Sequence, residues 1–262
     1  MTVDHFDVVA PAARRPRVMV FRNADAVARA LAARIAAAVA ARPAIVLGLP
    51  TGRTPVALYR ELGALHRKGG DFSGVTTFNL DEFLGIPPSH PGSYRSFMEE
   101  HLFKFVNIPT PRHNFLNGGA ADSERECARY EQAIEDAGGI DLQVLGIGTN
   151  GHIGFNEPAR ELAARTHRVT LKAETRRSNA SLFGGDPARV PAEALSMGMA
   201  SILDARAIVL VATGRTKASC VERAVNGPLT TDLPASFLQL HRDVDIMLDE
   251  AAAAELRQGG AA

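Results

Sequence analysis

The segment GTNGHIGFNEP, residues 148–158, gathers side chains that could transfer protons. A histidine that exchanges protons near pH 7 needs a neighbour that sets its tautomer, and a carboxylate can do this while supporting the imidazolium form. His152 has Asn150 and Glu157 close by in the sequence, and the glycines between them would let a ligand approach the backbone. A lone histidine is more typical of a hydrogen-bonded structural side chain, but this combination favours acid–base catalysis.

Two other kinds of site fit this segment poorly. A metal centre would need a second histidine or a cysteine at ligand spacing, and the sequence places none there. A Ser-His-Asp hydrolase would need a G-x-S-x-G turn, which is also missing. We therefore expect a site that works without a metal or a cofactor.

Asp81 and Glu82 offer two carboxylates directly after the apolar run 75–80. Acids in this position could simply cap a helix and place negative charge in its first turn. Their functional interpretation is a carboxylate base, for which one of the two groups suffices.

The segment PTGRTP places Thr51, Gly52 and Thr54 just before a helical pattern. The free N–H groups and partial positive charge of a helix N-terminus make such a place a natural phosphate cradle, although an ordinary cap with a proline in the first turn reads the same way. The spacing matches neither a Walker loop nor a GxGxxG fingerprint. A second segment, TGRTK, adds Lys217, whose ammonium could pair with a phosphate.

Strands that alternate with helices position these segments. Apolar runs predict six strands, and Val27, Leu31, Ile35 and Val39, spaced four apart, predict one stripe of a helix. The alternation favours a mostly parallel sheet covered on both faces, that is, a single-domain, Rossmann-like α/β three-layer sandwich over residues 18–262, preceded by a flexible arm over 1–17. The six expected strands are 18–21, 44–49, 75–80, 142–147, 208–212 and 244–248, and a further helix is expected over 122–137.

All four unusual segments follow predicted strands. In open α/β sheets, ligands bind beyond the carboxyl ends of the strands, so we expect these segments to converge on one site. The residues alone thus predict a cofactor-independent enzyme that transfers protons on a small phosphorylated molecule.

The composition narrows the partners and the compartment. Lys plus Arg equals Asp plus Glu at 29 each, so no global field attracts nucleic acid or an anionic membrane. No apolar run approaches membrane-spanning length, and the start of the sequence lacks a secretory apolar core. Cys127 and Cys220 lack metal-ligand spacing and are expected as buried thiols in a reducing compartment. We expect a cytoplasmic protein with no nucleic-acid or membrane partner.

Three segments also resemble a known family. LGLPTGRTPVALY, FNLDEFLGIPPSHPGSYRSFM and GIGTNGHIGFNEPA are similar to the signature segments of glucosamine-6-phosphate deaminases, also called isomerases. The resemblance runs in order from about residue 18 to 249. The related 6-phosphogluconolactonases share the fold but typically carry a DER-type segment and a GHTASLF-like ending, where this chain has DEF and GHIGFNE.

The resemblance implies conversion of glucosamine 6-phosphate and water to fructose 6-phosphate and ammonia, with a mobile helical lid after GHIGFNEP. Asp81 matches the base that moves a proton between C2 and C1. His152 matches the residue that opens the sugar ring, assisted by Glu157, with Asn150 supporting it through an amide. The phosphate-loop positions are matched by Thr51, Gly52, Thr54 and Lys217.

Two departures from the family concern the phosphate. Members commonly carry glycine at the position of Arg53 and a phosphate-binding arginine at the position of Ser181, on the lid. Our hypothesis is that Arg53 supplies the missing guanidinium from the other side of the site; the alternative is a solvated Arg53 and a looser site. Where effector-activated hexameric members carry basic residues, this chain has His167 and Val169, so we expect no activation by N-acetylglucosamine 6-phosphate.

Other functions remain open at this stage. The substrate could be galactosamine 6-phosphate, the enzyme could be a lactonase, or the chain could be a sugar-phosphate sensor without turnover. A homo-oligomer is possible, but the sequence assigns no oligomeric state.

Overall fold

The computed structural model describes residues 16–256, so nearly all of the arm expected over 1–17 lies outside the described residues. Within them, seven strands form one large, wholly parallel sheet in the order β1-β10-β9-β6-β2-β3-β5. All six expected strands belong to this sheet; the two-residue β5 was not predicted. The strands are β1 (Arg17–Phe21), β2 (Val46–Leu49), β3 (Thr76–Asn79), β5 (His113–Asn114), β6 (Leu142–Gly146), β9 (Ala207–Ala212) and β10 (Val244–Asp249).

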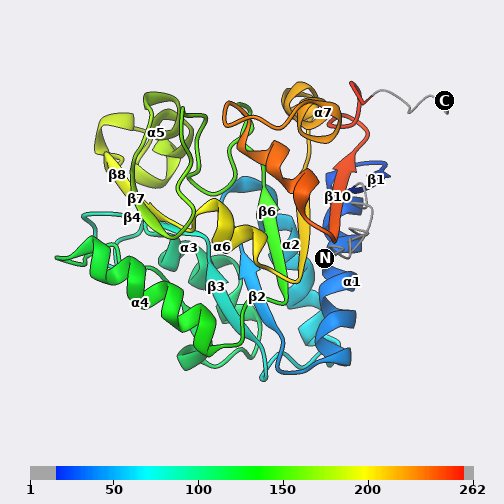
Figure 1. Cartoon of the computed structure of the whole chain (residues 1–262). Coiled ribbons are helices and arrows are strands. Elements are labelled where there is room, and N and C mark those ends of the chain that lie inside the picture. The colour runs from blue at the N-terminus through cyan, green and yellow to red at the C-terminus, as the bar shows by residue number, and fades with distance from the viewer. Residues whose placement is uncertain (1–15, 257–262) are drawn as a thin grey trace, which may run out of the picture.

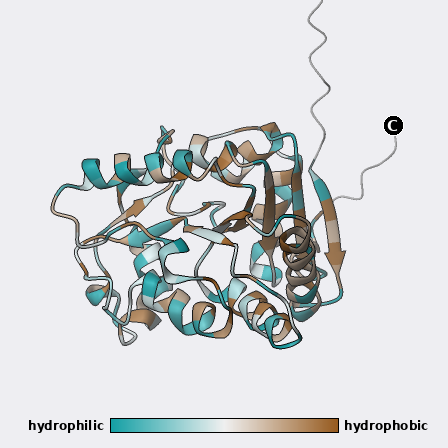
Figure 2. Ribbon diagram, turned by 90° about the horizontal axis from the view of Figure 1, so that it is seen from below, coloured by the Kyte–Doolittle hydropathy of each residue, from teal (hydrophilic) through white to brown (hydrophobic). Residues whose placement is uncertain are grey.

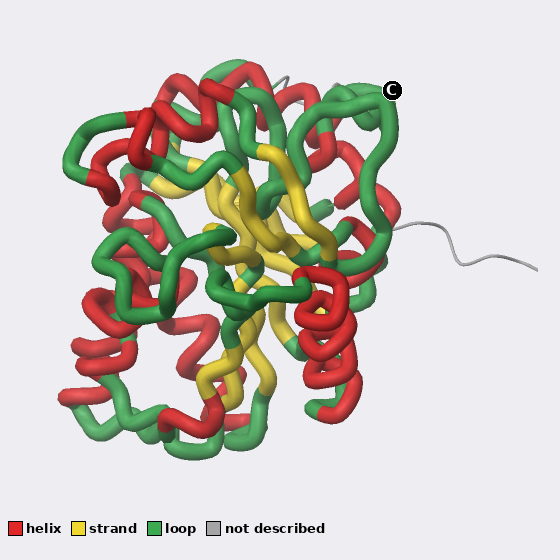
Figure 3. The backbone as a smooth tube through the Cα atoms, turned by 90° about the vertical axis from the view of Figure 1, so that its left-hand side faces the viewer, coloured by secondary structure: helices red, strands yellow, loops and turns green. Residues whose placement is uncertain are grey.

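Helices cover both faces of the sheet, which confirms the three-layer α/β sandwich (Figure 1; Figure 3). One apolar cluster joins α1, α2 and α3 to one face, and another joins α4, α6 and α7 to the opposite face. The helices are α1 (Ala24–Ala41), α2 (Arg53–Arg67), α3 (Tyr94–His101), α4 (Ser123–Asp136), α5 (Ala173–Asn179), α6 (Met199–Leu203) and α7 (Ala218–Asn226).

The predicted apolar patterns account for this core. The stripe of α1 is buried at each expected position, and the Asn23 side chain caps the helix by accepting from the Ala26 N–H at 3.0 Å. The central strands are buried on both faces, so apolar residues concentrate there while polar residues lie on the outer helices (Figure 2). Each fully buried aliphatic side chain contributes roughly 1.5–3 kcal/mol of transfer free energy. None of the helices within residues 16–256 is long and apolar enough to cross a membrane.

A second, three-stranded antiparallel sheet was not predicted. It consists of β4 (Asp81–Phe83), β7 (His167–Thr170) and β8 (Glu193–Ser196) in the order β4-β8-β7. Asp81 and Glu82 follow the end of β3 at Asn79, as expected, but they also begin β4. The reason is a long-range pairing: β4 pairs with β8, more than a hundred residues later, and no local pattern predicts that contact.

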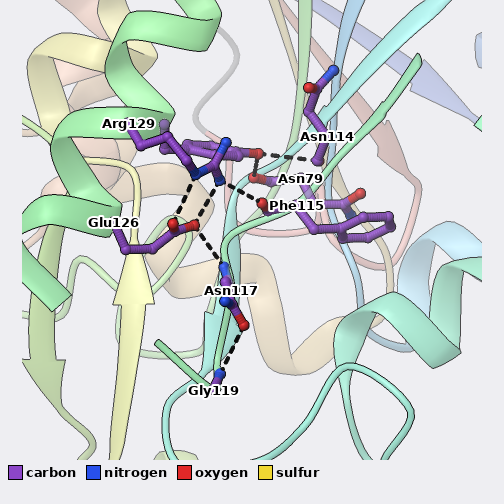
Figure 4. Close-up of polar contacts among 8 residues, drawn as sticks. Asn79, Asn114, Phe115, Asn117, Gly119, Glu126 and Arg129 are labelled. Carbon is purple, nitrogen blue, oxygen red and sulfur yellow. Dashed lines mark hydrogen bonds and ion pairs between the residues drawn. The ribbon is translucent and has the colours of Figure 1, made fainter. Parts of the chain in front are cut away.

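Helix α4 ties the edge of the large sheet to the loop behind β4. The Tyr130 hydroxyl donates to the carbonyl of Asn79 at 2.6 Å, and Glu126 accepts the N–H of Asn117 at 2.8 Å (Figure 4). The next residue, Gly118, accepts a hydrogen bond from Gly85 at 2.7 Å, and a Cβ there would lie 2.1 Å from a carbonyl of β4. The loop therefore packs directly against β4 and holds Asp81 and Glu82 in place.

The segment expected as a lid is helical. It comprises α5 and the 3₁₀ helix η3 (Ala180–Phe183), which lie beside the small sheet (Figure 1). A third apolar cluster, containing Phe83, Tyr94, Phe155 and Phe183, packs between α5, η3 and β4. Its mobility stays a prediction.

Candidate active site

A cavity of about 450 Å³ opens where β2 and β6 end, between the N-terminus of α2 and the helical lid segment. Eight of the nine residues singled out in the sequence line it, so the convergence of strand exits brings them together. They are Thr51, Gly52, Arg53, Thr54, Asp81, Asn150, His152 and Lys217.

His152 is held in one tautomer by an amide. Its Nδ1 lies 2.7 Å from Oδ1 of Asn150, which only accepts hydrogen bonds, so Nδ1 carries the proton and Nε2 keeps a lone pair. Burial and then the charges of Lys217 and Lys172 lower the pKa of His152 to about 4. The imidazole is thus neutral near pH 7 and can accept a proton through Nε2.

Glycine makes room for this imidazole. A Cβ on Gly148 would lie 2.2 Å from the His152 ring, so the space at this glycine is filled by protein and not by a ligand, contrary to the expectation from the sequence. Gly151 adopts a φ of +84°, and a Cβ there would meet Leu233 at 2.2 Å. The turn that carries His152 therefore requires glycine for packing and backbone conformation.

Glu157 lies behind the cavity wall. Its Oε1 accepts a hydrogen bond from the hydroxyl of Thr175, a wall residue on α5, and its Oε2 lies 3.8 Å from Nζ of Lys172. Oε2 is buried and has no hydrogen-bond partner in the described part of the chain, nor does any hydrogen bond there join Glu157 to His152. The sequence placed Glu157 beside His152, whereas the structure connects it to the lid segment.

Asp81 is a buried carboxyl on the cavity wall. Burial, and to a lesser extent the charge of Glu82, raises the pKa of Asp81 to about 8. Gly154 packs beside it, since an added Cβ there would lie 3.6 Å from Oδ2 of Asp81 and 3.1 Å from Oγ of Ser196. Asp81 is therefore mostly protonated at pH 7, and a cation bound beside it would favour its ionised form.

Glu82 serves a different purpose from its neighbour. Its two carboxyl oxygens accept the N–H groups of Phe83 and Tyr94 at 2.9 Å and of Arg95 at 3.0 Å, at the start of α3. Burial raises the pKa of Glu82 to about 7, and these three N–H groups oppose the rise. No helix directly follows the two acids, so the alternative of a local helix cap is wrong for both; Glu82 instead accepts the first two N–H groups of α3, whose N-cap residue is Ser93.

The part of the cavity at the N-terminus of α2 has the charges and N–H groups to bind an anion. Helix α2 begins there after Gly52, whose φ is +98° and whose Cα hydrogens face open space. Lys217 reaches the cavity from the 3₁₀ helix η5 (Arg215–Lys217), and burial and the nearby charge of Arg53 lower its pKa. A helix N-terminus and two cations therefore meet at one place.

Several wall residues escaped the sequence reasoning. Tyr94 and His101 come from the two ends of α3, and the lid segment adds five residues besides Ser181. Only Tyr94 lay in a segment already noted for its resemblance; the others carried no local signal, because the folding of the lid over the cavity brings them there. The five lid residues are Glu174, Thr175, Ser178, Asn179 and Leu182.

The described residues form no metal site, and both cysteines are free thiols. The described residues contain no group of three or more His, Cys, Asp or Glu side chains placed to hold a metal ion. Cys127 and Cys220 are both free and buried, as the sequence predicted.

The family model described as glucosamine-6-phosphate isomerases/6-phosphogluconolactonase matches residues 22–247. The chain belongs to this family. The glucosamine-6-phosphate isomerase resemblance read from the three segments is thus confirmed over most of the sequence. A relative from Giardia intestinalis, glucosamine-6-phosphate deaminase 2, is 49% identical over 243 residues, which cover 92% of each chain.

Solved structures of the family agree with the fold. A monomeric glucosamine-6-phosphate deaminase superposes with a TM-score of 0.88 at 41% identity and covers 92% of this chain and 100% of its own. A 6-phosphogluconolactonase from Shewanella baltica gives a TM-score of 0.70 at 22% identity, covering 90% and 99%. The second likeness shows the shared fold alone.

Proposed function

We propose that this chain is a glucosamine-6-phosphate deaminase, which converts glucosamine 6-phosphate and water to fructose 6-phosphate and ammonia in amino-sugar catabolism. The Giardia relative and the monomeric solved structure both bear that name and match nearly the whole chain. The observation that carries the proposal is one cavity that holds a neutral His152 with a free Nε2, a buried Asp81 and an anion-binding end.

The phosphate would bind at the N-terminus of α2. Backbone N–H groups of the turn at Gly52 and the hydroxyls of Thr51 and Thr54 would surround its oxygens, with Lys217 as the balancing charge. His152 and Asp81 line the same cavity, so a sugar held by its phosphate at this loop would have its ring within the cavity that these two residues line.

Ring opening needs a base for the C1 hydroxyl. Nε2 of His152 would take that proton while the bond between C1 and the ring oxygen breaks, and the ring oxygen would then be protonated. Oδ1 of Asn150 would hold Nδ1–H throughout and stabilise the imidazolium. Glu157, behind Thr175, would assist through its negative charge.

Isomerisation needs a second base. Ionised Asp81 would remove the proton from C2 while the C1 carbonyl oxygen takes a proton released by the ammonium group, which gives an enolamine. Asp81 would then return its proton to C1, which leaves a hydroxyl at C1 and an iminium at C2. Water would then add to C2, and ammonia would leave with the formation of the ketone. The substrate's ammonium group, bound near Asp81, would lower the raised pKa of this carboxyl and prepare it as a base.

The test is ammonia release from glucosamine 6-phosphate, with galactosamine 6-phosphate and 6-phosphogluconolactone in parallel. We expect turnover of the gluco sugar and a loss of about 10²–10⁴-fold in kcat for Asp81→Asn. Turnover of only the galacto sugar or only the lactone would reassign the substrate. Binding without turnover of any of the three would indicate a sensor.

The proposed substrate also bears on location. A phosphorylated amino sugar is charged and does not cross an apolar bilayer unaided. We therefore keep the cytoplasm as the expected compartment.

A further inference from the structure

Tyr94 is a wall residue that takes no part in the proposed proton transfers by His152 and Asp81. It is the first residue of α3, its side chain is buried, and it lines the same cavity as Asp81. Its ring packs against Phe83 and Phe155, with ring centroids 4.8 and 5.9 Å away. Packing on two sides leaves the hydroxyl as the part of the side chain that can respond to a ligand.

The Tyr94 hydroxyl lies between the lid and the phosphate loop. It donates to Oδ1 of Asn179, on α5, at 3.1 Å. Burial and the nearby charge of Asp81 raise the pKa of Tyr94 well above its usual value, while the nearby Thr51 side chain lowers it. The hydroxyl thus meets the last residue of α5 and the first residue of the phosphate loop, and it remains a neutral donor at working pH.

Glu82 fixes the end of α3 from which Tyr94 projects. Its carboxyl group accepts the backbone N–H groups of Tyr94 and Arg95, so it satisfies two of the donors that a helix leaves free at its start. Successive side chains of a strand point to opposite faces. One dipeptide, Asp81-Glu82, therefore sends its first carboxyl into the cavity and its second to α3.

We propose that Tyr94 is a substrate-positioning residue: its hydroxyl holds the lid segment against the phosphate loop around a hexosamine phosphate, and Glu82 keeps it there. The inference rests on the proposed function and deepens it. It assigns Glu82 a role in substrate binding that is separate from the base chemistry of Asp81.

The direct test is Tyr94→Phe, which removes the hydroxyl and keeps the ring. We expect KM for glucosamine 6-phosphate to rise about tenfold, the loss typical of one hydrogen bond, while kcat changes less than about threefold. Ser201→Ala is the control, because it also removes one buried hydroxyl, which donates to Glu131, and neither of these residues lines the cavity. It should lower Tm and leave KM unchanged.

Double variants test how the three residues are connected. If Tyr94 acts through Asn179, Asn179→Ala should raise KM in the wild type but by less than about twofold in the Tyr94→Phe background. Glu82→Gln should show the same dependence on Tyr94. Independent, multiplying effects on KM would overturn the link between these residues and Tyr94.

A binding measurement separates this inference from the proposed function. Calorimetric titration with inorganic phosphate needs no turnover, and we expect Tyr94→Phe to weaken phosphate binding about fivefold. An inactive wild type that shows this weakening would reject the deaminase and retain the positioning role. An active wild type with unchanged phosphate affinity and KM in Tyr94→Phe would retain the deaminase and reject the positioning role. An equal rise in KM in Ser201→Ala would also reject the positioning role.

Discussion

His152 and Asp81 lie on the wall of one cavity, where burial acts in opposite directions on a base and on an acid. It lowers the pKa of His152 to about 4 and raises that of Asp81 to about 8, so both are uncharged at pH 7 before substrate binds. The neutral imidazole is ready to accept a proton. The carboxyl must first lose its own, which the cation of an amino sugar would favour.

These two shifts predict the pH dependence of kcat/KM. Because Asp81 must be ionised to act as a base, kcat/KM should fall tenfold per pH unit below about pH 8, while the pKa of His152 adds no second inflection above pH 5. Initial rates of ammonia release across this range measure it. An acid limb centred near pH 6.5, the value of an ordinary histidine, would contradict the assignment.

The same carboxyl should cost stability at high pH. Its folded pKa of about 8 exceeds the usual 3.8, so the folded state binds this proton more tightly than the unfolded state. The free energy of unfolding is therefore highest below pH 3.8 and falls as the pH rises toward 8. Asn cannot ionise, so Asp81→Asn should raise Tm by at least about 2–4 °C at pH 8.5, the shift that ~1 kcal/mol produces in a protein of this size. The gain should shrink toward pH 5. Thermal melts at both pH values measure this difference. A lower Tm of Asp81→Asn at pH 8.5 would show that ionisation of Asp81 does not destabilise the fold.

The packing of individual elements positions each functional group in the cavity. The turn that follows β6 closes tightly, because the Gly148 N–H donates to the carbonyl of His152 at 2.9 Å. On the far side, Asn156 donates to the carbonyl of Met197 at 2.8 Å and fixes the turn to the end of β8. The small sheet therefore supports both the His152 turn and the Asp81 strand.

Gly148→Ala tests the packing of this turn. The added Cβ would lie 2.2 Å from the imidazole, so the His152 ring must move, and we expect kcat to fall about 10²-fold or more. Gly119→Ala is the control, since an added Cβ there meets only contacts of 3.5 Å or longer. Steady-state kinetics of both variants measure the effect. An active Gly148→Ala enzyme would mean that the position of His152 matters less than proposed.

Substitution of Arg53 tests whether the N-terminus of α2 binds the phosphate. It is the first residue of the helix, exposed at the cavity mouth, and its charge lowers the pKa of Lys217, whereas Ser181 lines the same cavity without a charge. If Arg53 binds the phosphate, Arg53→Gly should raise KM about 10–100-fold with little change in Tm, because a charge-assisted hydrogen bond is lost. Arg60→Ala, an exposed arginine of the same helix that does not line the cavity, serves as control. An unchanged KM for Arg53→Gly would leave Arg53 solvated.

The whole molecule is one sandwich whose cavity is built from its own chain. Its described wall residues come from the ends of β2 and β6, from the start of β4, from α2 and α3, from the turn that carries His152, from the lid segment and from η5.

We predict hyperbolic kinetics without activation by N-acetylglucosamine 6-phosphate. The family resemblance implies that His167 and Val169 stand where activated members carry basic residues, so this sugar should leave KM unchanged. Rate curves with and without the sugar measure both points. Sigmoidal kinetics that the sugar makes hyperbolic would contradict the prediction.

The sequence by itself determined the alternation of strands and helices, the buried stripe of α1 and the kinds of chemistry at each strand exit. These follow from local patterns, since the spacing of apolar residues reports which face is buried. The tertiary structure alone decided that Asp81 begins a strand of a second sheet and that Glu82 accepts the first N–H groups of α3. It also decided that Gly148 makes room for an imidazole and that Glu157 contacts the lid segment. Each of these depends on contacts between side chains and segments in three dimensions, and the free energy of such contacts leaves no periodic trace along the chain.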